Sequence, residues 1–200
     1  MNILAYQVEE LECPSCGAPI GIDTQVCPHC FRDIVVRTFH TIGSLTPKEA
    51  NQRIKAYDKM LQQNPDYAEA YLSKAFCYLR LGLYDKAIPC FDKAIEENLE
   101  EADAYFYAAV ARLRGKRPFL TGKKEIEKIE EYLNAATMLE EKGIYAYFHA
   151  YLKNDYYEKK KLRSNPTSRE LLEQAARMGF SQADKEELQQ ILGLEMPTGF

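Results

Sequence analysis

The 200-residue chain contains no tryptophan and no long apolar segment. No run of apolar residues approaches the roughly 18–20 that a membrane-spanning helix requires. The first residues, Met1 to Tyr6, are too few and too polar for a secretory signal peptide. We therefore expect a cytoplasmic protein that has no membrane partner.

Recognisable catalytic motifs are also missing. The sequence has no glycine-rich phosphate loop, no Gly-x-Ser-x-Gly elbow and no His-Glu-x-x-His pair. It contains three histidines, and one of them, His29, lies between two cysteines. With 26 basic and 30 acidic side chains, the chain as a whole does not attract nucleic acid. These absences indicate a protein that is not an enzyme.

Four of the six cysteines form two close pairs near the N-terminus, in the sequences Cys-Pro-Ser-Cys at 13–16 and Cys-Pro-His-Cys at 27–30. Each two-residue gap lets a tight turn direct two thiolates toward one point, and two such turns supply a tetrahedral set of sulfur ligands. In a cytosolic chain this pattern favours a metal, whereas in an exported protein it would favour two disulfides. We expect one structural Zn²⁺ ion, bound by Cys13, Cys16, Cys27 and Cys30. The ion replaces a hydrophobic core that so short a segment cannot form.

This segment resembles the small zinc-ribbon family with paired Cys-Pro-x-Cys knuckles. Members of that family often have glycine after both knuckles, whereas here Gly17 follows the first and Phe31 the second. The shape of the second turn is therefore open, and Phe31 is expected to pack on the hairpin or to serve as a contact point. Residues 34–38 have strand composition and are expected to extend a short β-hairpin. We assign residues 1–42 to the ribbon.

Signals for helices dominate the rest of the chain. Capping boxes begin at Thr46 and Thr167, Ser181 precedes another helix, and Gly193 is placed to end it. Strand signals are absent after about residue 42. The sequence predicts a mostly α fold with a helical domain over residues 43–193. The last helix, about 182–192, is expected to be a polar cap, and residues 194–200 a flexible tail.

Residues 68–101 form a 34-residue unit with a recognisable internal pattern. Its fourth, eighth, eleventh, twentieth, twenty-fourth and twenty-seventh positions are Tyr71, Ala75, Tyr78, Ala87, Phe91 and Ala94. This unit resembles the tetratricopeptide repeat. The resemblance implies antiparallel helix pairs stacked into a superhelix, with the ribbon in place of the first helix of the upstream repeat. The alternative is an irregular helical bundle.

The resemblance also implies a concave surface lined by the first helix of each repeat. The positions that would line it are Leu72, Phe76, Leu79, Arg80, Phe106 and Val110. They lack the Lys and Asn with which chaperone-binding relatives hold a terminal carboxylate. An apolar groove suits a helix or extended segment of another protein or peptide, although these residues would otherwise contact only neighbouring helices. The predicted function is a non-enzymatic protein–protein interaction adaptor or scaffold.

A basic loop at 112–124 supports an alternative function. It contains Arg112, Arg114, Lys116, Arg117, Lys123 and Lys124 and no acidic residue. A second basic run occupies residues 159–163. If the two runs meet, they form a patch that attracts phosphate, as expected for a nucleic-acid-associated factor. The simpler interpretation is that both runs are solvated helix ends and turns.

Overall fold

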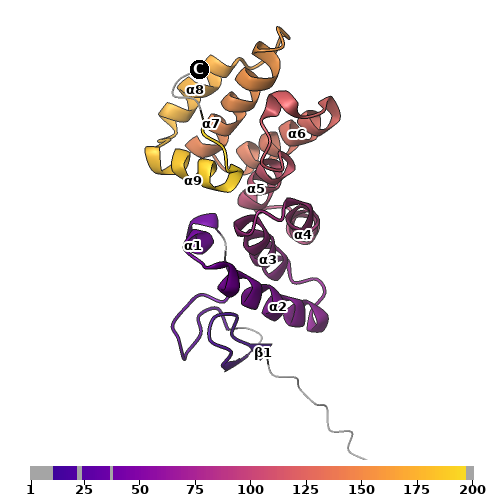
Figure 1. The fold of residues 1–200 in the computed structure, drawn as a ribbon, viewed down its shortest axis with the longest axis vertical. Helices are drawn as coiled ribbons and strands as arrows, with labels where there is room; N and C mark the ends of the chain where they lie inside the picture. The colour runs from indigo at the N-terminus through magenta and orange to yellow at the C-terminus, as the bar shows by residue number, and fades with distance from the viewer. Residues whose placement is uncertain (1–10, 22–23, 37, 197–200) are drawn as a thin grey trace, which may run out of the picture.

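The computed structural model describes residues 11–21, 24–36 and 38–196. The chain is mostly α-helical, and its helices stack in pairs along one axis, with the cysteine-rich segment at one end (Figure 1). This arrangement confirms the predicted fold class. Within the described ranges, no helix is both long and apolar enough to cross a bilayer.

The cysteine-rich segment contains a short antiparallel hairpin. Strand β1 (Leu11–Glu12) pairs with β2 (Pro19–Ile20), and Val26 forms an isolated bridge with Asp33. The described residues of 34–38 do not form the predicted strand. Their backbone instead contacts the helices. Here the N–H of Val36 donates a 2.8 Å hydrogen bond to Oγ of Ser73 in α3. Residue 37 lies outside the described residues.

Two helices follow the ribbon. Helix α1 (Phe39–Gly43) is short, and α2 (Pro47–Gln63) starts at the predicted capping box. The expected domain boundary between residues 42 and 43 falls inside α1. Phe39 and Ile42 of α1 are buried in the same cluster as the helical repeats. The helical core therefore begins at α1, before the predicted boundary.

The predicted 34-residue unit is an antiparallel helix pair made of α3 (Ala68–Arg80) and α4 (Tyr84–Glu97). Gly82 makes the turn between the helices with a φ of +67°, a conformation that glycine adopts without steric cost. Ala75, Ala87 and Ala94 are buried, and their small side chains let the two helices approach closely. The prediction for this unit is confirmed.

Further pairs continue the stack. Helix α5 (Ala102–Arg112) packs on α6 (Lys123–Leu139), and a 3₁₀ turn, η1 (Pro118–Leu120), lies in the loop between them. Helix α7 (Gly143–Leu152) packs on α8 (Ser168–Arg177) and continues into a π-helical segment, η2 (Lys153–Glu158). A π-helix is uncommon, and such segments often accompany functional sites.

The last helix does not behave as the sequence predicts. Helix α9 (Gln182–Leu192) begins at the Ser181 cap and ends at Gly193 as expected, but it contacts α5 and α7. It buries Leu188, Ile191 and Leu192, so the predicted polar cap is wrong. Met196 is also buried, with 4 % of its surface exposed, which overturns the flexible tail at that position. Residues 197–200 lie outside the described residues.

Candidate functional site

The two cysteine knuckles share one backbone geometry. In the first, the N–H of Gly17 donates to the carbonyl of Cys13 at 2.9 Å, and in the second, Phe31 bonds to Cys27 at the same distance. Gly17 has a φ of +74° and Phe31 a φ of +57°. The second turn therefore keeps the shape of the first, although a bulky side chain pays a steric cost in this region. Phe31 is 80 % exposed, so the expectation that it packs on the hairpin is wrong.

The four cysteine sulfurs converge on one point. Their Sγ atoms all lie within 4.8 Å of one another. The Cys13–Cys30 and Cys16–Cys27 sulfur pairs are each 3.8 Å apart. A regular tetrahedron of sulfurs around zinc, with bonds of about 2.3 Å, has edges of about 3.8 Å. The donor set and its spacing thus fit a four-cysteine metal site.

The electrostatics of the cluster also favour a bound cation. Burial opposes ionisation of Cys27, but the backbone N–H groups of Cys30 and His29 lower its pKa to about 6. At Cys16 a backbone hydrogen bond from Ala18 acts to lower the pKa, yet burial and the other cysteines outweigh it and raise the value to about 12. Four thiols this close cannot all ionise beside one another unless a positive charge offsets their repulsion.

The knuckles do not stand apart from the helices. Cys13, Cys27 and Ile34 share a buried cluster with residues of α2 and α3, among them Ile54 and Met60. This shared cluster makes the ribbon and the first helices a single packed unit.

Polar contacts fix how the ribbon sits on α2. Arg53 donates from Nη2 to Oγ of Ser15 at 2.6 Å, and the hydroxyl of Tyr57 donates to the carbonyl of Ile34 at 2.7 Å. Neither Arg53 nor Tyr57 was predicted from the sequence as a contact of the ribbon. The available signal was a charged residue, Arg53, on the same helical stripe as Ala50, Ile54 and Tyr57.

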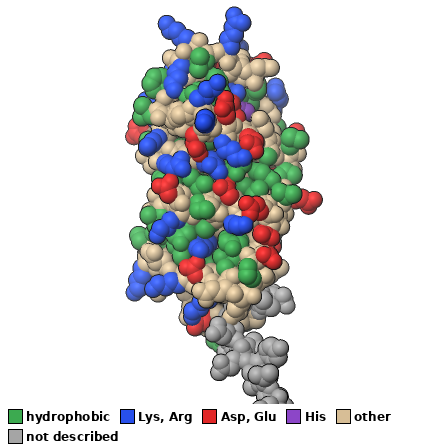
Figure 2. Space-filling view, turned by 90° about the vertical axis from the view of Figure 1, so that its right-hand side faces the viewer, with side chains coloured by type: hydrophobic (Ala, Val, Ile, Leu, Met, Phe, Trp, Pro, Cys, Tyr) green, Lys and Arg blue, Asp and Glu red, His purple; other side chains and the backbone are tan. Residues whose placement is uncertain are grey.

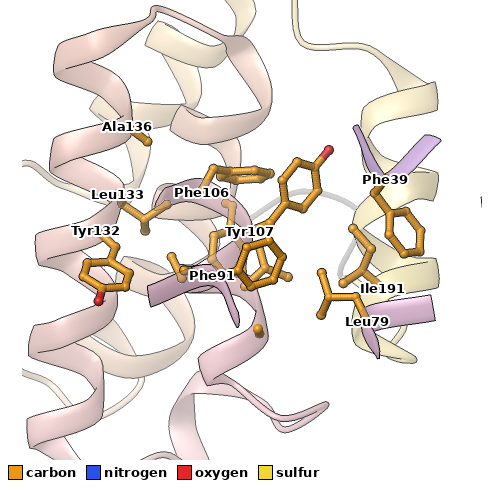
Figure 3. Packing of buried hydrophobic residues seen from close by; sticks show 14 of the residues in the cluster. Phe39, Leu79, Phe91, Phe106, Tyr107, Tyr132, Leu133, Ala136 and Ile191 are labelled. Atoms are coloured by element: carbon orange, nitrogen blue, oxygen red, sulfur yellow. The ribbon is translucent and has the colours of Figure 1, made fainter. Parts of the chain in front are cut away.

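The concave surface is covered by the chain itself. Helix α1 contacts α3, while α9 contacts α5 and α7, and Figure 3 shows Phe39 of α1 and Ile191 of α9 near Leu79 of α3. The predicted lining residues Leu72, Phe76, Leu79, Phe106 and Val110 are each at most 2 % exposed. Their role as an open groove is therefore wrong, because other helices of the chain bury them. Besides α1 and α9 near Leu79, α7 packs Tyr145 and Phe148 on Phe106. Arg80, at the end of α3, is partly exposed.

Most cations of the basic loop face carboxylates. Arg112 bonds to Asp92 and Glu125, Arg114 to Asp85, Arg117 to Asp155, and Lys123 lies 3.6 Å from Glu127. Lys116 and Lys124 are exposed. Pairing reduces the positive potential that a phosphate backbone would meet at this loop. The partners of the three arginines could not be read from the sequence because they come from α4, α6 and η2.

A cavity of about 410 Å³ opens where the ribbon meets the repeats. It is lined by Gln25, Val26, Asp33, Val35, Thr38, Tyr67 and Glu69. The first five belong to the ribbon and its connection to α1, and the last two lie at the start of α3. Val26 is 50 % exposed, so an apolar side chain lies at this cavity beside the carboxylates of Asp33 and Glu69. No pattern in the sequence indicates this juxtaposition.

Comparison with known proteins agrees with the helical architecture. The model of the tetratricopeptide repeat family matches residues 68–101, the same unit found in the sequence. A solved structure described as a MamA RS-1 ArsTM double mutant is similar in fold, with a TM-score of 0.54 and 18 % sequence identity. The similarity covers 70 % of each chain. No curated protein matches the sequence. These likenesses establish a tetratricopeptide-like fold.

Proposed function

We propose that the protein is a non-enzymatic protein–protein interaction scaffold whose ribbon is held by one structural Zn²⁺ ion. The observation that carries this proposal is the core that Cys13 and Cys27 share with α2 and α3. Because the knuckles bury part of α2, the metal that holds the knuckles also stabilises the helical repeats. A four-cysteine site leaves no open position for a reacting water, so the zinc acts structurally.

The partner surface in this proposal is the accessible cavity between the ribbon and α3. Helices α1 and α9 cover the concave face, whereas the cavity between the ribbon and α3 is accessible. It presents apolar Val26 beside the carboxylates of Asp33 and Glu69. This combination suits an extended segment of another protein that carries a basic side chain next to an apolar one.

The proposal places the protein in the cytoplasm, where thiols stay reduced and available to zinc. The alternative function, a nucleic-acid-associated factor using residues 112–124, has less support. Three arginines of that loop, Arg112, Arg114 and Arg117, already bind carboxylates of this chain.

Metal content and thermal unfolding test the zinc role. Elemental analysis of the purified protein should find one zinc per chain. Removing the metal with a chelator under reducing conditions should lower the melting temperature of the helices, followed by far-ultraviolet circular dichroism. An unchanged melting temperature would show that the ribbon and the repeats are independent, contrary to the proposal.

Site-directed photo-crosslinking tests the scaffold role. A photoreactive phenylalanine analogue replaces Val26, which is 50 % exposed at the cavity. In the control protein the same analogue replaces Leu99, which follows α4 and is 65 % exposed. In an extract of the source organism, position 26 should crosslink to a defined protein that position 99 does not capture. Equal capture at both positions, or none at position 26, contradicts a partner site at this cavity.

A further inference from the structure

The two basic runs meet at the end of the molecule opposite the ribbon. Residues 116–120 and 159–163, named here the basic end, lie against each other because η1 contacts η2. Figure 2 shows Lys and Arg side chains projecting at this end. The chain has a net charge of −4, so a basic end is a local departure from the average.

A single buried carboxylate holds the basic end together. Asp155, in η2, has a fully buried side chain and accepts hydrogen bonds from Arg117, from Nζ of Lys159 at 2.6 Å, and from the N–H of Phe119 at 2.9 Å. Burial acts to raise the pKa of Asp155, but Arg117, Lys159 and the Phe119 amide outweigh it and hold the pKa below its usual value. The arrangement fixes both runs in place before any partner arrives.

This anchoring leaves apolar side chains in solvent. Phe119 is 42 % exposed, Leu120 is 69 % exposed and Leu162 is 48 % exposed. The backbone around them is ordered by hydrogen bonds: the N–H of Leu162 donates to the carbonyl of Tyr157 at 2.8 Å. Exposed apolar side chains on a fixed backbone, surrounded by cations, are typical of an interaction surface.

The surface has a crevice that fits one large apolar group. Arg117, Phe119, Leu120 and Lys159 line a crevice of about 240 Å³. The ammonium of Lys160 lies 5.1 Å from the centre of the Phe119 ring, beside the crevice. A ligand that suits this site combines an apolar anchor with neighbouring negative charge.

The nearby acidic groups are already engaged. Asp155 binds the residues named above, and Glu158 accepts hydrogen bonds from Ser168 Oγ at 2.6 Å and from Asn154 at 3.2 Å. Asp155 therefore offsets the charge of Arg117 and Lys159, whereas Lys161 and Arg163 are exposed and have no ion pair among the described residues.

The shape and chemistry favour a protein ligand over other anions. The ammonium of Lys160 already lies 5.1 Å over the Phe119 ring, and aliphatic Leu120 and Leu162 offer no ring on which nucleic-acid bases stack. A membrane presents a broad hydrocarbon boundary, whereas a small crevice selects a single side chain. We propose that the basic end binds an acidic segment of a partner protein, which inserts one large apolar side chain between Phe119 and Leu120. This inference rests on the proposed scaffold function and gives it a second site, remote from the ribbon cavity.

A defined peptide probe tests the proposal with the full-length protein. The probe is a fluorescein-labelled peptide with Leu-Phe at its centre and three acidic residues on each side, followed by fluorescence anisotropy. Replacing Leu-Phe by Ala-Ala should weaken binding about tenfold, because the anchor is lost. Added salt should also weaken binding.

Matched variants locate the site. Leu120→Ser should weaken peptide binding about tenfold. Leu99→Ser should leave binding unchanged, although Leu99 is 65 % exposed and Leu120 is 69 % exposed. The charge-reversed pair Lys160→Glu and Arg163→Glu should abolish binding. The control pair Lys48→Glu and Lys55→Glu, with the same net charge, should retain it.

Several outcomes overturn the proposal. They are no binding of the acidic peptide, equal losses in the Leu120 and Leu99 variants, and preference for single-stranded RNA or phosphatidylserine vesicles over the peptide. If peptide binding fails while the crosslink at Val26 persists, the basic end is wrong and the scaffold role stands. If the crosslink fails while peptide binding is lost in the Leu120 variant, the ribbon cavity is wrong and the basic end stands.

Discussion

The hydroxyl of Tyr84, the first residue of α4, donates a 2.8 Å hydrogen bond to the carbonyl oxygen of Ile191 near the end of α9. The two residues are 107 positions apart in the sequence. A second bond, 2.5 Å from the hydroxyl of Tyr107 to Glu187, joins the same helix to α5. These contacts hold α9 against α4 and α5.

Truncating the buried face of α9 should destabilise the whole helical part. Leu188 is fully buried, and Leu188→Ala should lower the free energy of unfolding by about 2–4 kcal/mol through the cavity it leaves. Leu99→Ala, at an exposed leucine, should change it by less than about 0.5 kcal/mol. Urea unfolding measures both. Equal stability of the two variants would mean that α9 is a detached helix.

Removing one hydroxyl should loosen the ribbon from α2. Tyr57→Phe keeps the buried ring but loses the bond to the carbonyl of Ile34, which leaves that oxygen unsatisfied. The expected cost is about 1–2 kcal/mol in the free energy of unfolding, with zinc lost at lower chelator concentration. Tyr71→Phe is the control, since the described part of the chain gives its hydroxyl no hydrogen bond. A ribbon that keeps its zinc equally well in both variants would argue against this contact.

The two knuckle turns should respond to substitution in opposite ways. Phe31 adopts a φ of +57° and is 80 % exposed, so Phe31→Gly should relieve strain and stabilise the ribbon by about 1 kcal/mol. Gly17 has a φ of +74°, so Gly17→Ala should destabilise the ribbon by a similar amount. Competition with a coloured chelator measures the zinc affinity of each. Loss of affinity in Phe31→Gly would instead show that the aromatic side chain supports the knuckle.

Glu130 should make the stability of the folded state depend on pH in the acidic range. Burial acts to raise its pKa, but the imidazole of His149, 3.6 Å away, and hydrogen bonds from Lys153 and Tyr157 prevail and lower the pKa from 4.5 to about 2. A carboxylate with a lowered pKa stabilises the folded state above its unfolded pKa, and this contribution disappears as pH falls through the folded value. Because solvent screens part of the cluster, Glu130→Gln should cost about 1–2 kcal/mol at neutral pH.

The pH profile separates this effect from a general loss of packing. The free energy of unfolding of Glu130→Gln and that of the unmodified protein should converge as the pH falls from 4.5 to about 2. Urea unfolding at each pH measures both values. Glu131→Gln, at a neighbouring carboxylate that pairs with Lys128 on the surface, should have an effect of less than about 0.5 kcal/mol. A difference that stays constant with pH would contradict the assigned role of Glu130.

Local sequence determined the elements whose causes lie within a few residues. Helix starts at Thr46, Thr167 and Ser181 depend on side chains that reach backbone groups three residues away, so they could be recognised directly. The spacing of the four cysteines likewise fixed which thiols converge, because each pair lies on one tight turn. The alternation of small and large residues in 68–101 specified the close pairing of α3 and α4.

Tertiary structure alone decided which surfaces are open. The same apolar positions, such as Leu79 and Phe106, serve equally as a groove or as a core. The choice depends on the helices that pack against them: α1 and α9 lie near Leu79, and Tyr145 and Phe148 of α7 contact Phe106. The net charge of a loop is local, but its potential depends on carboxylates that the fold brings near, as Asp92 and Asp155 do for Arg112 and Arg117. Helical periodicity shows that a face is buried, and only three-dimensional packing shows what buries it.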